Sequence, residues 1–98
     1  MEKDAGIARR QVEIVNTYGL HLRPSTRFVK LASSFQSEVW VHYGGRKANG
    51  KRVLEMTSLA AERGTTIDLE ARGPDAEQAI AALAELVAAG FHMDEEGD

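Results

Sequence analysis

Cysteine is absent from this 98-residue chain, and aromatic residues make up only 6% of it. Without thiols the chain has no disulfide, no thiolate nucleophile and no cysteine-ligated zinc. Its three histidines lack the short spacing of a metal site, so we expect neither a metal nor a cofactor. No apolar run approaches the roughly 20 residues of a membrane span, and residues 1–10 do not resemble a signal peptide. We therefore expect a soluble, cytoplasmic protein with no membrane partner.

Charge is distributed unevenly along the chain. The net charge is −3, yet the segment from Arg23 to Arg52 holds seven basic residues and one acidic residue, Glu38. Four acidic residues lie among the last five, residues 94–98. We interpret those acids as a solvated tail and the basic segment as the part of the chain that attracts a partner.

Hydrophobic periodicity predicts four strands and three helices. Val12 and Ile14 alternate with polar residues, as is typical of a strand with one buried face, whereas Phe28 and Leu31 recur at helical spacing. The predicted strands cover residues 11–16, 38–43, 46–48 and 65–71, and the predicted helices cover residues 22–34, 53–59 and 75–89.

The elements follow the order β-α-β-β-α-β-α. Because each helix has one apolar stripe and the strands have one apolar face, all the helices should cover the same face of the sheet. We predict an α+β fold, an open two-layer sandwich of a four-stranded, mostly antiparallel sheet under three helices. The domain should span residues 11–91, between a flexible N-terminal extension (residues 1–10) and the acidic tail (residues 92–98). Asp75 and Gln78 have the spacing of a capping box at the start of the last helix.

The most specific motif is the heptapeptide GLHLRPS, residues 19–25, which joins the first strand to the first helix. The N–H groups of a first helical turn and the helix dipole favour a bound anion, and Pro24 is compatible with that turn because its nitrogen needs no hydrogen bond there. A neutral imidazole is a nucleophile near pH 7. His21 is therefore able to hold a phosphoryl group, which Arg23 would stabilise by charge-assisted hydrogen bonds.

This heptapeptide resembles the active-site signature of the HPr family, the histidine phosphocarriers of the bacterial phosphoenolpyruvate-dependent phosphotransferase system. The similarity extends from about Gln11 to Ala89, through Asn16, Phe28 and Gly73 at similar spacing. The resemblance implies an HPr-like open-faced β-sandwich with an antiparallel sheet under three helices, in agreement with the periodicity.

The resemblance also implies residue roles. His21 would take a phosphoryl group on Nδ1 from enzyme I and pass it to a histidine of a IIA component, as a relay rather than an enzyme. Arg23 would steady that group together with the backbone amides of Leu22 and Arg23, beside Pro24, and no metal would take part. Partners would dock on the first and second helices, and the candidate contact residues are Arg27, Lys51, Arg52, Val53, Leu54 and Met56. We expect a monomer that also binds regulatory proteins.

Two positions depart from the family pattern. Arg52 stands where the family commonly has a serine that a regulatory kinase phosphorylates in some bacteria, so phosphorylation at that position is excluded. Leu22 replaces a small residue beside the histidine and would narrow partner choice. The segment 89–91 is similar to NPr, the homologue of the nitrogen branch, so sugar uptake and regulation without sugar transport both remain open.

Two other classes of protein share the order of elements. An RNA-binding sheet module would stack bases on aromatic residues of its central strands, and residues 65–71 contain none. An acylphosphatase-like enzyme would need an arginine cradle and a catalytic asparagine, and would leave His21 without a role. We therefore expect no nucleic-acid partner. Of the other histidines, His42 should face solvent and His92 should lie in a fraying end.

Overall fold

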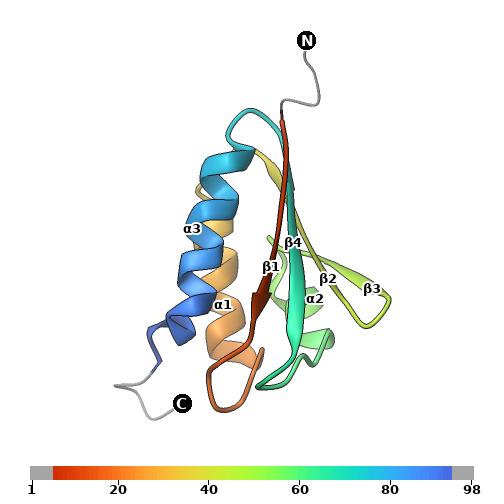
Figure 1. Ribbon diagram of the computed structural model, residues 1–98, viewed down its shortest axis with the longest axis vertical. Coiled ribbons are helices and arrows are strands. Elements are labelled where there is room, and N and C mark those ends of the chain that lie inside the picture. The colour runs from red at the N-terminus through yellow and green to blue at the C-terminus, as the bar shows by residue number, and fades with distance from the viewer. Residues whose placement is uncertain (1–5, 94–98) are drawn as a thin grey trace.

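The computed structural model describes residues 6–93, which form a four-stranded sheet packed against helices (Figure 1). Along the chain the elements are β1 (Ile7–Glu13), α1 (Leu22–Ala32), β2 (Glu38–Tyr43), β3 (Arg46–Asn49), α2 (Val53–Ser58), β4 (Thr66–Arg72), α3 (Ala76–Ala88) and the short 3₁₀ helix η1 (Gly90–His92). The predicted order of strands and α-helices is confirmed, and η1 is an addition that the periodicity does not predict.

The strands lie in the order β1-β4-β2-β3, and every neighbouring pair is antiparallel. Alternation along β2 places Val39 and Val41 in the core, where Val41 pairs with the buried Leu69 of β4. Figure 1 shows α1 and α3 side by side along the sheet, and α2 packs against α1 and β3. A single buried cluster takes in residues of the sheet and of all three α-helices, so the helices share one face of the sheet, as predicted.

The first strand differs from its predicted bounds. β1 (Ile7–Glu13) begins before the predicted strand over residues 11–16, because Ile7 already pairs with Arg72 of β4. Ahead of Val12 only Ala8 is buried in this strand, so its apolar alternation is too weak to recognise in the sequence. The sheet therefore includes residues 7–10, for which the sequence predicts a flexible extension.

The core continues beyond α3 as far as Met93. Phe91 and Met93 are fully buried, which corrects the predicted fraying end at His92. Gly90, Phe91 and His92 all have positive φ angles, of 64°, 58° and 58°, and this left-handed backbone ends the α-helical path. Of the predicted extension and tail, residues 1–5 and 94–98 lie outside the described residues.

The start of α3 is held by a contact that differs from the predicted capping box. Asp75 makes no side-chain capping hydrogen bond. Its carboxylate instead accepts hydrogen bonds from the backbone N–H groups of Gln36 and Ser37, both at 2.9 Å, and from the Ser37 hydroxyl at 2.6 Å. The hydrogen bond from Ser37 is the largest of the effects that hold the pKa of Asp75 below its ordinary value. Asp75 thus ties α3 to the connection between α1 and β2.

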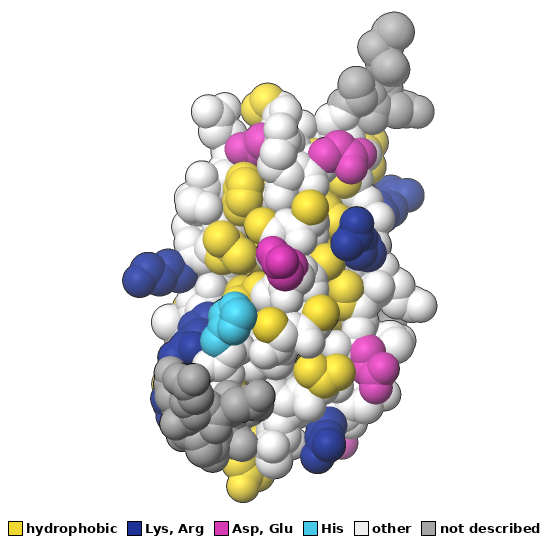
Figure 2. Space-filling model, turned by 60° about the vertical axis from the view of Figure 1, so that its left-hand side comes forward, with side chains coloured by type: hydrophobic (Ala, Val, Ile, Leu, Met, Phe, Trp, Pro, Cys, Tyr) yellow, Lys and Arg dark blue, Asp and Glu magenta, His cyan; other side chains and the backbone are white. Residues whose placement is uncertain are grey.

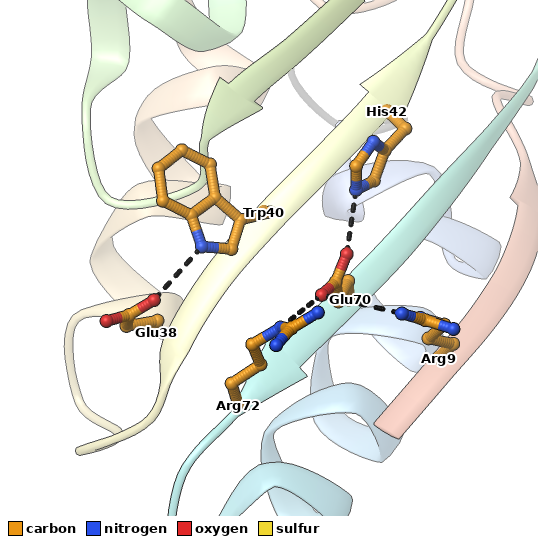
Figure 3. A network of polar contacts seen from close by, with 6 residues as sticks. All are labelled: Arg9, Glu38, Trp40, His42, Glu70 and Arg72. Carbon is orange, nitrogen blue, oxygen red and sulfur yellow. Dashed lines mark hydrogen bonds and ion pairs between the residues drawn. The ribbon is translucent and has the colours of Figure 1, made fainter. Parts of the chain in front are cut away.

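The sheet face opposite the helices carries a polar network centred on Glu70 (Figure 3). The Glu70 carboxylate accepts a hydrogen bond from Arg72 Nε at 2.5 Å, lies 2.9 Å from His42 Nε2 and lies 3.9 Å from the guanidinium of Arg9. The hydrogen bond from Arg72 lowers the pKa of Glu70 below its ordinary value of 4.5, although burial opposes the shift. His42 lies on the sheet face opposite the helices, as the sequence predicts, and on that face its imidazole contacts Glu70.

Replacing the central carboxylate should reduce stability in a pH-dependent way. We expect Glu70→Gln to lower the free energy of unfolding at pH 7 by about 1 kcal/mol, because a nearly buried carboxylate loses charge-assisted hydrogen bonds to partly exposed partners. A folded-state pKa below that of the unfolded chain stabilises the fold at neutral pH, and this contribution disappears as the pH falls through the lowered value. Urea unfolding should therefore show a deficit at pH 7 that shrinks at pH 3.

Asp68→Asn is the matched control on the same strand, since Asp68 is exposed and, within residues 6–93, accepts one long side-chain hydrogen bond, from Gln11 Nε2 at 3.3 Å. Its effect should stay within about 0.5 kcal/mol. Equal losses for the two variants, or a Glu70→Gln deficit that is the same at both pH values, would contradict the role of the network.

Candidate functional site

His21 occupies the N-cap position of α1, directly after the loop that leaves β1. Its backbone is extended, with φ −79° and ψ −169°, and its carbonyl accepts the first helical hydrogen bond from Ser25 N at 3.1 Å. The imidazole makes no capping hydrogen bond to the helix. The backbone amides of a first helical turn, here those of Leu22 and Arg23, have no acceptor within the helix itself.

The loop before His21 is held in place by hydrogen bonds to its backbone. Asn16 Nδ2 donates to the Gly19 carbonyl at 2.8 Å, Leu20 N donates to the Ala61 carbonyl at 2.9 Å, and Ser25 Oγ donates to the Leu20 carbonyl at 3.2 Å. Gly19 has a φ of +69°, and a Cβ at this position would lie 2.3 Å from the Ala61 carbonyl oxygen. Only glycine allows this close approach, which fixes the direction in which the chain enters α1.

An aromatic ring lies beside His21. The rings of Tyr18 and His21 are arranged edge to face, with centroids 6.0 Å apart and an interplanar angle of 86°. Tyr18 is 68% exposed, so its ring is positioned at the surface rather than used in the core. Sequence reasoning missed Tyr18, because only the bend at Gly19 brings it back toward the histidine.

The remaining residues of the heptapeptide divide into exposed and buried positions. Leu22 is 60% exposed and Arg23 is also exposed, whereas Pro24 and Ser25 are buried under the first turn. The structure therefore places the predicted residues His21 and Arg23 and the first-turn amides at the same end of α1. Pro24 is buried and packs beneath the first turn of α1.

The predicted partner-contact residues are not equally accessible. Leu54 is 80% exposed on α2, and Arg52 is exposed at the N-cap of the same helix. Lys51 and Val53 are partly buried, and Lys51 Nζ donates to the Phe35 carbonyl at 2.8 Å. Met56 is fully buried in the hydrophobic core. The prediction that it contacts a partner directly is therefore wrong, because its apolar side chain packs inside the protein.

Arg27 has a structural contact that the sequence does not reveal. Its guanidinium Nη1 donates to the Phe91 and His92 carbonyls, both at 3.0 Å. These two residues belong to η1, far along the chain, so Arg27 joins the middle of α1 to the C-terminal turn. The spacing of charged residues in a sequence carries no signal for such a contact with backbone carbonyls.

The site lies in a basic environment. α1 contains Arg23, Arg27 and Lys30 and no acidic residue. In the view that brings the side of α1 and α3 forward, Lys and Arg side chains lie at the left edge, at the right edge and at the bottom, and hydrophobic side chains fill much of the surface between them (Figure 2). Among residues 6–93 no group of three His, Asp or Glu side chains is arranged to hold a metal ion, and no helix has the length and apolar character needed to cross a membrane.

Comparison with protein-family models matches residues 8–89 to the model described as "PTS HPr component phosphorylation site". The chain is 43% identical over 79 residues to phosphocarrier protein HPr of Neisseria meningitidis, which covers 81% of this chain and 89% of the relative. It is 42% identical over 82 residues to phosphocarrier protein NPr of Shewanella violacea, which covers 84% of this chain and 90% of the relative.

Solved structures give the same result for the fold. The crystal structure of HPr-C-His from Thermoanaerobacter tengcongensis matches with a TM-score of 0.83 and 39% sequence identity, over 87% of this chain and 96% of that one. A phosphocarrier protein HPr from Bacillus anthracis matches with a TM-score of 0.79 and 32% identity, over 83% and 96% of the two chains.

Proposed function

Because the chain belongs to the HPr family, we propose that His21 is its phosphoryl acceptor. The protein is a phosphocarrier of the phosphotransferase system, which relays phosphoryl groups from enzyme I and is not itself a catalyst. One observation carries this assignment. His21 is the N-cap of α1, yet its imidazole is not used as a cap, so the ring stands beside first-turn amides that suit an anion.

The chemistry needs little beyond position and charge. As His21 Nδ1 forms its bond to phosphorus, the bond from phosphorus to the donor's histidine nitrogen breaks, and the donor imidazole leaves with the electron pair of that bond. Transfer passes through a loose transition state whose charge lies on the phosphoryl oxygens. The amides of Leu22 and Arg23 and the Arg23 guanidinium would stabilise that charge, and the packed turn at Pro24 would hold them in position.

The family implies enzyme I and IIA components as partners. We place their contact on the exposed surfaces of α1 and α2, with Leu22, Arg52 and Leu54 as the most accessible residues. Lys51 and Val53, which are partly buried, would contact a partner at the edge of this surface. Arg27 would mainly hold η1 in place through its hydrogen bonds, and the buried Met56 would anchor α2 to the core. We further propose that the protein acts as a monomer in the cytoplasm.

A second candidate is an NPr-like regulatory role without sugar transport. Identity to NPr of Shewanella violacea is 42% and identity to HPr of Neisseria meningitidis is 43%, so the identity values do not separate the two branches. Parallel assays with a sugar-branch enzyme I and a nitrogen-branch enzyme I would separate them, because the true donor should phosphorylate the chain at the lower protein concentration.

The assignment is tested by incubating the full chain with enzyme I and phosphoenolpyruvate. Intact-mass measurement should show one added phosphoryl group, which is lost in acid and retained in base. Long-range nitrogen-15 NMR on the imidazole should place that group on Nδ1 of His21. If no adduct forms under conditions in which a Neisseria meningitidis HPr is phosphorylated, or if it maps to another side chain, the assignment is wrong.

Removing the nearby guanidinium should slow transfer but leave the fold intact. We expect Arg23→Ala to reduce the rate of phosphorylation by about 100-fold, as is typical when one donor to a developing oxyanion is removed. Because Arg23 is exposed, the free energy of unfolding should change by less than about 0.5 kcal/mol. Rapid-quench measurements with phospho-enzyme I would give the rate.

Arg10→Ala is the matched control, since it removes the same charge from an exposed position on β1. It should leave the rate nearly unchanged, and Arg23→Lys should recover part of the lost rate because the positive charge returns. Similar slowing by Arg10→Ala and Arg23→Ala would point to a loss of overall charge instead of a local role.

A further inference from the structure

The turn before His21 presents an aromatic ring to the imidazole. Residues 16–19 form a tight turn that two hydrogen bonds close: Gly19 N donates to the Asn16 carbonyl at 3.3 Å, and Asn16 Nδ2 donates to the Gly19 carbonyl at 2.8 Å. Asn16 is itself buried, so the turn is anchored to the core. Tyr18 lies within this turn, and its backbone is therefore held in place although its side chain is exposed.

The ring of Tyr18 lies against His21 without being forced there. The two rings meet edge to face, with centroids 6.0 Å apart and an interplanar angle of 86°, a geometry that aromatic pairs favour. Tyr18 is 68% exposed, and a hollow of about 300 Å³ lined by Thr17, Tyr18, Glu62 and Arg63 leaves space beside it. The contact with the imidazole is therefore an attraction between the rings and not a result of crowding.

Phosphoryl transfer depends on the direction in which the imidazole points. The χ2 torsion of a histidine has a broad, roughly two-fold preference, so a half-turn exchanges the places of Nδ1 and Cδ2. Transfer needs Nδ1 in line with phosphorus, because the bond from Nδ1 to phosphorus forms as the bond from phosphorus to the donor's histidine nitrogen breaks on the opposite side. A neighbour that restrains the imidazole reduces the rotational freedom that must be lost when these atoms align.

We propose that Tyr18 is a positioning residue for phosphoryl transfer, whose ring restrains the His21 imidazole in the orientation that presents Nδ1 to the donor phosphorus. This inference rests on the proposed function of His21. Tyr18 acts through the histidine and not on the phosphoryl group, and the effect comes from its ring because the contact joins the two ring systems. The site thus includes a residue that precedes the heptapeptide GLHLRPS.

Transfer from phospho-enzyme I, followed by rapid quench, tests this role with two substitutions at one position. Tyr18→Leu removes the ring and keeps an apolar side chain, whereas Tyr18→Phe keeps the ring and removes the hydroxyl. With the full chain at varied concentration, Tyr18→Leu should lower the limiting rate of transfer about two- to ten-fold, the range that an aromatic pair is worth. It should leave the half-saturating concentration unchanged, and Tyr18→Phe should keep both quantities at the values of the unmodified chain.

Leu54→Ala is the contrasting variant, because Leu54 is 80% exposed on the proposed partner surface. It should raise the half-saturating concentration and leave the limiting rate unchanged. If Tyr18→Leu behaves like Leu54→Ala, Tyr18 contacts the partner and the positioning role is overturned. Equal losses of limiting rate in Tyr18→Leu and Tyr18→Phe overturn it as well, because the hydroxyl would then carry the effect.

Nuclear magnetic resonance of the unphosphorylated chain tests the contact itself. Nuclear Overhauser effects between the aromatic ring at position 18 and the His21 ring should be present in the unmodified chain and in Tyr18→Phe. Carbon-13 relaxation of the His21 imidazole should show motion of larger amplitude in Tyr18→Leu. Absence of the ring-to-ring effects, or unchanged imidazole motion in Tyr18→Leu, overturns the proposal. These signals need no phosphoryl transfer, so they decide the contact even if His21 proves not to be the acceptor.

Discussion

The His21→Ala variant is expected to take up no phosphoryl group from enzyme I and phosphoenolpyruvate while it keeps its fold. Alanine offers no nucleophile, and the chain has no cysteine to replace the imidazole. Since the imidazole makes no capping hydrogen bond to α1, its loss should change the free energy of unfolding by no more than about 1 kcal/mol. Intact-mass measurement after incubation, with circular dichroism for the fold, checks both parts.

His42→Ala is the control for this experiment. It removes an imidazole from the open face of the sheet, where His42 Nε2 lies 2.9 Å from Glu70. This variant should still gain one phosphoryl group at the rate of the unmodified chain. An adduct on His21→Ala would contradict the relay, and so would loss of the adduct in His42→Ala.

Gly19→Ala should have the largest effect on stability among substitutions near the site. The added Cβ would lie 2.3 Å from the Ala61 carbonyl oxygen and 2.9 Å from Glu62 Cα, so backbone on one side must move. A left-handed φ of +69° costs a non-glycine residue about 1–2 kcal/mol more. With the strain of overpacking added, we expect a loss of about 3 kcal/mol or more in the free energy of unfolding, measured by urea denaturation.

Gly44→Ala isolates the steric part of this loss. Gly44 has a similar φ of +59°, but no heavy atom lies within 4 Å of the position that its Cβ would take. Its substitution should cost only about 1 kcal/mol, from backbone strain alone. If Gly19→Ala cost no more than Gly44→Ala, the loop before His21 would be less tightly packed against residue 61 than the structure indicates. Phosphorylation should also slow in Gly19→Ala, because the loop that aims His21 is displaced.

Local patterns were sufficient for most of the secondary structure. β2 spans the predicted residues 38–43, and α1 ends close to its predicted boundary, because their apolar residues alternate or recur with a clear period. β1 was displaced because the segment 7–10 buries only Ala8, and its pairing with β4 is a long-range contact. The prediction of a capping box at α3 is wrong because the Asp75 carboxylate accepts hydrogen bonds from Ser37, which is remote in sequence.

The sequence by itself determined which chemical groups lie together at the start of α1. The heptapeptide at residues 19–25 contains an imidazole, a guanidinium and a helix start within a few positions of one another, and residues so near in sequence are close in any fold. Only the tertiary structure decided what surrounds them. The edge contact of Tyr18 with His21, the burial of Met56 and the contact of Arg27 with η1 depend on how distant segments pack, and side-chain periodicity carries no information on such pairings.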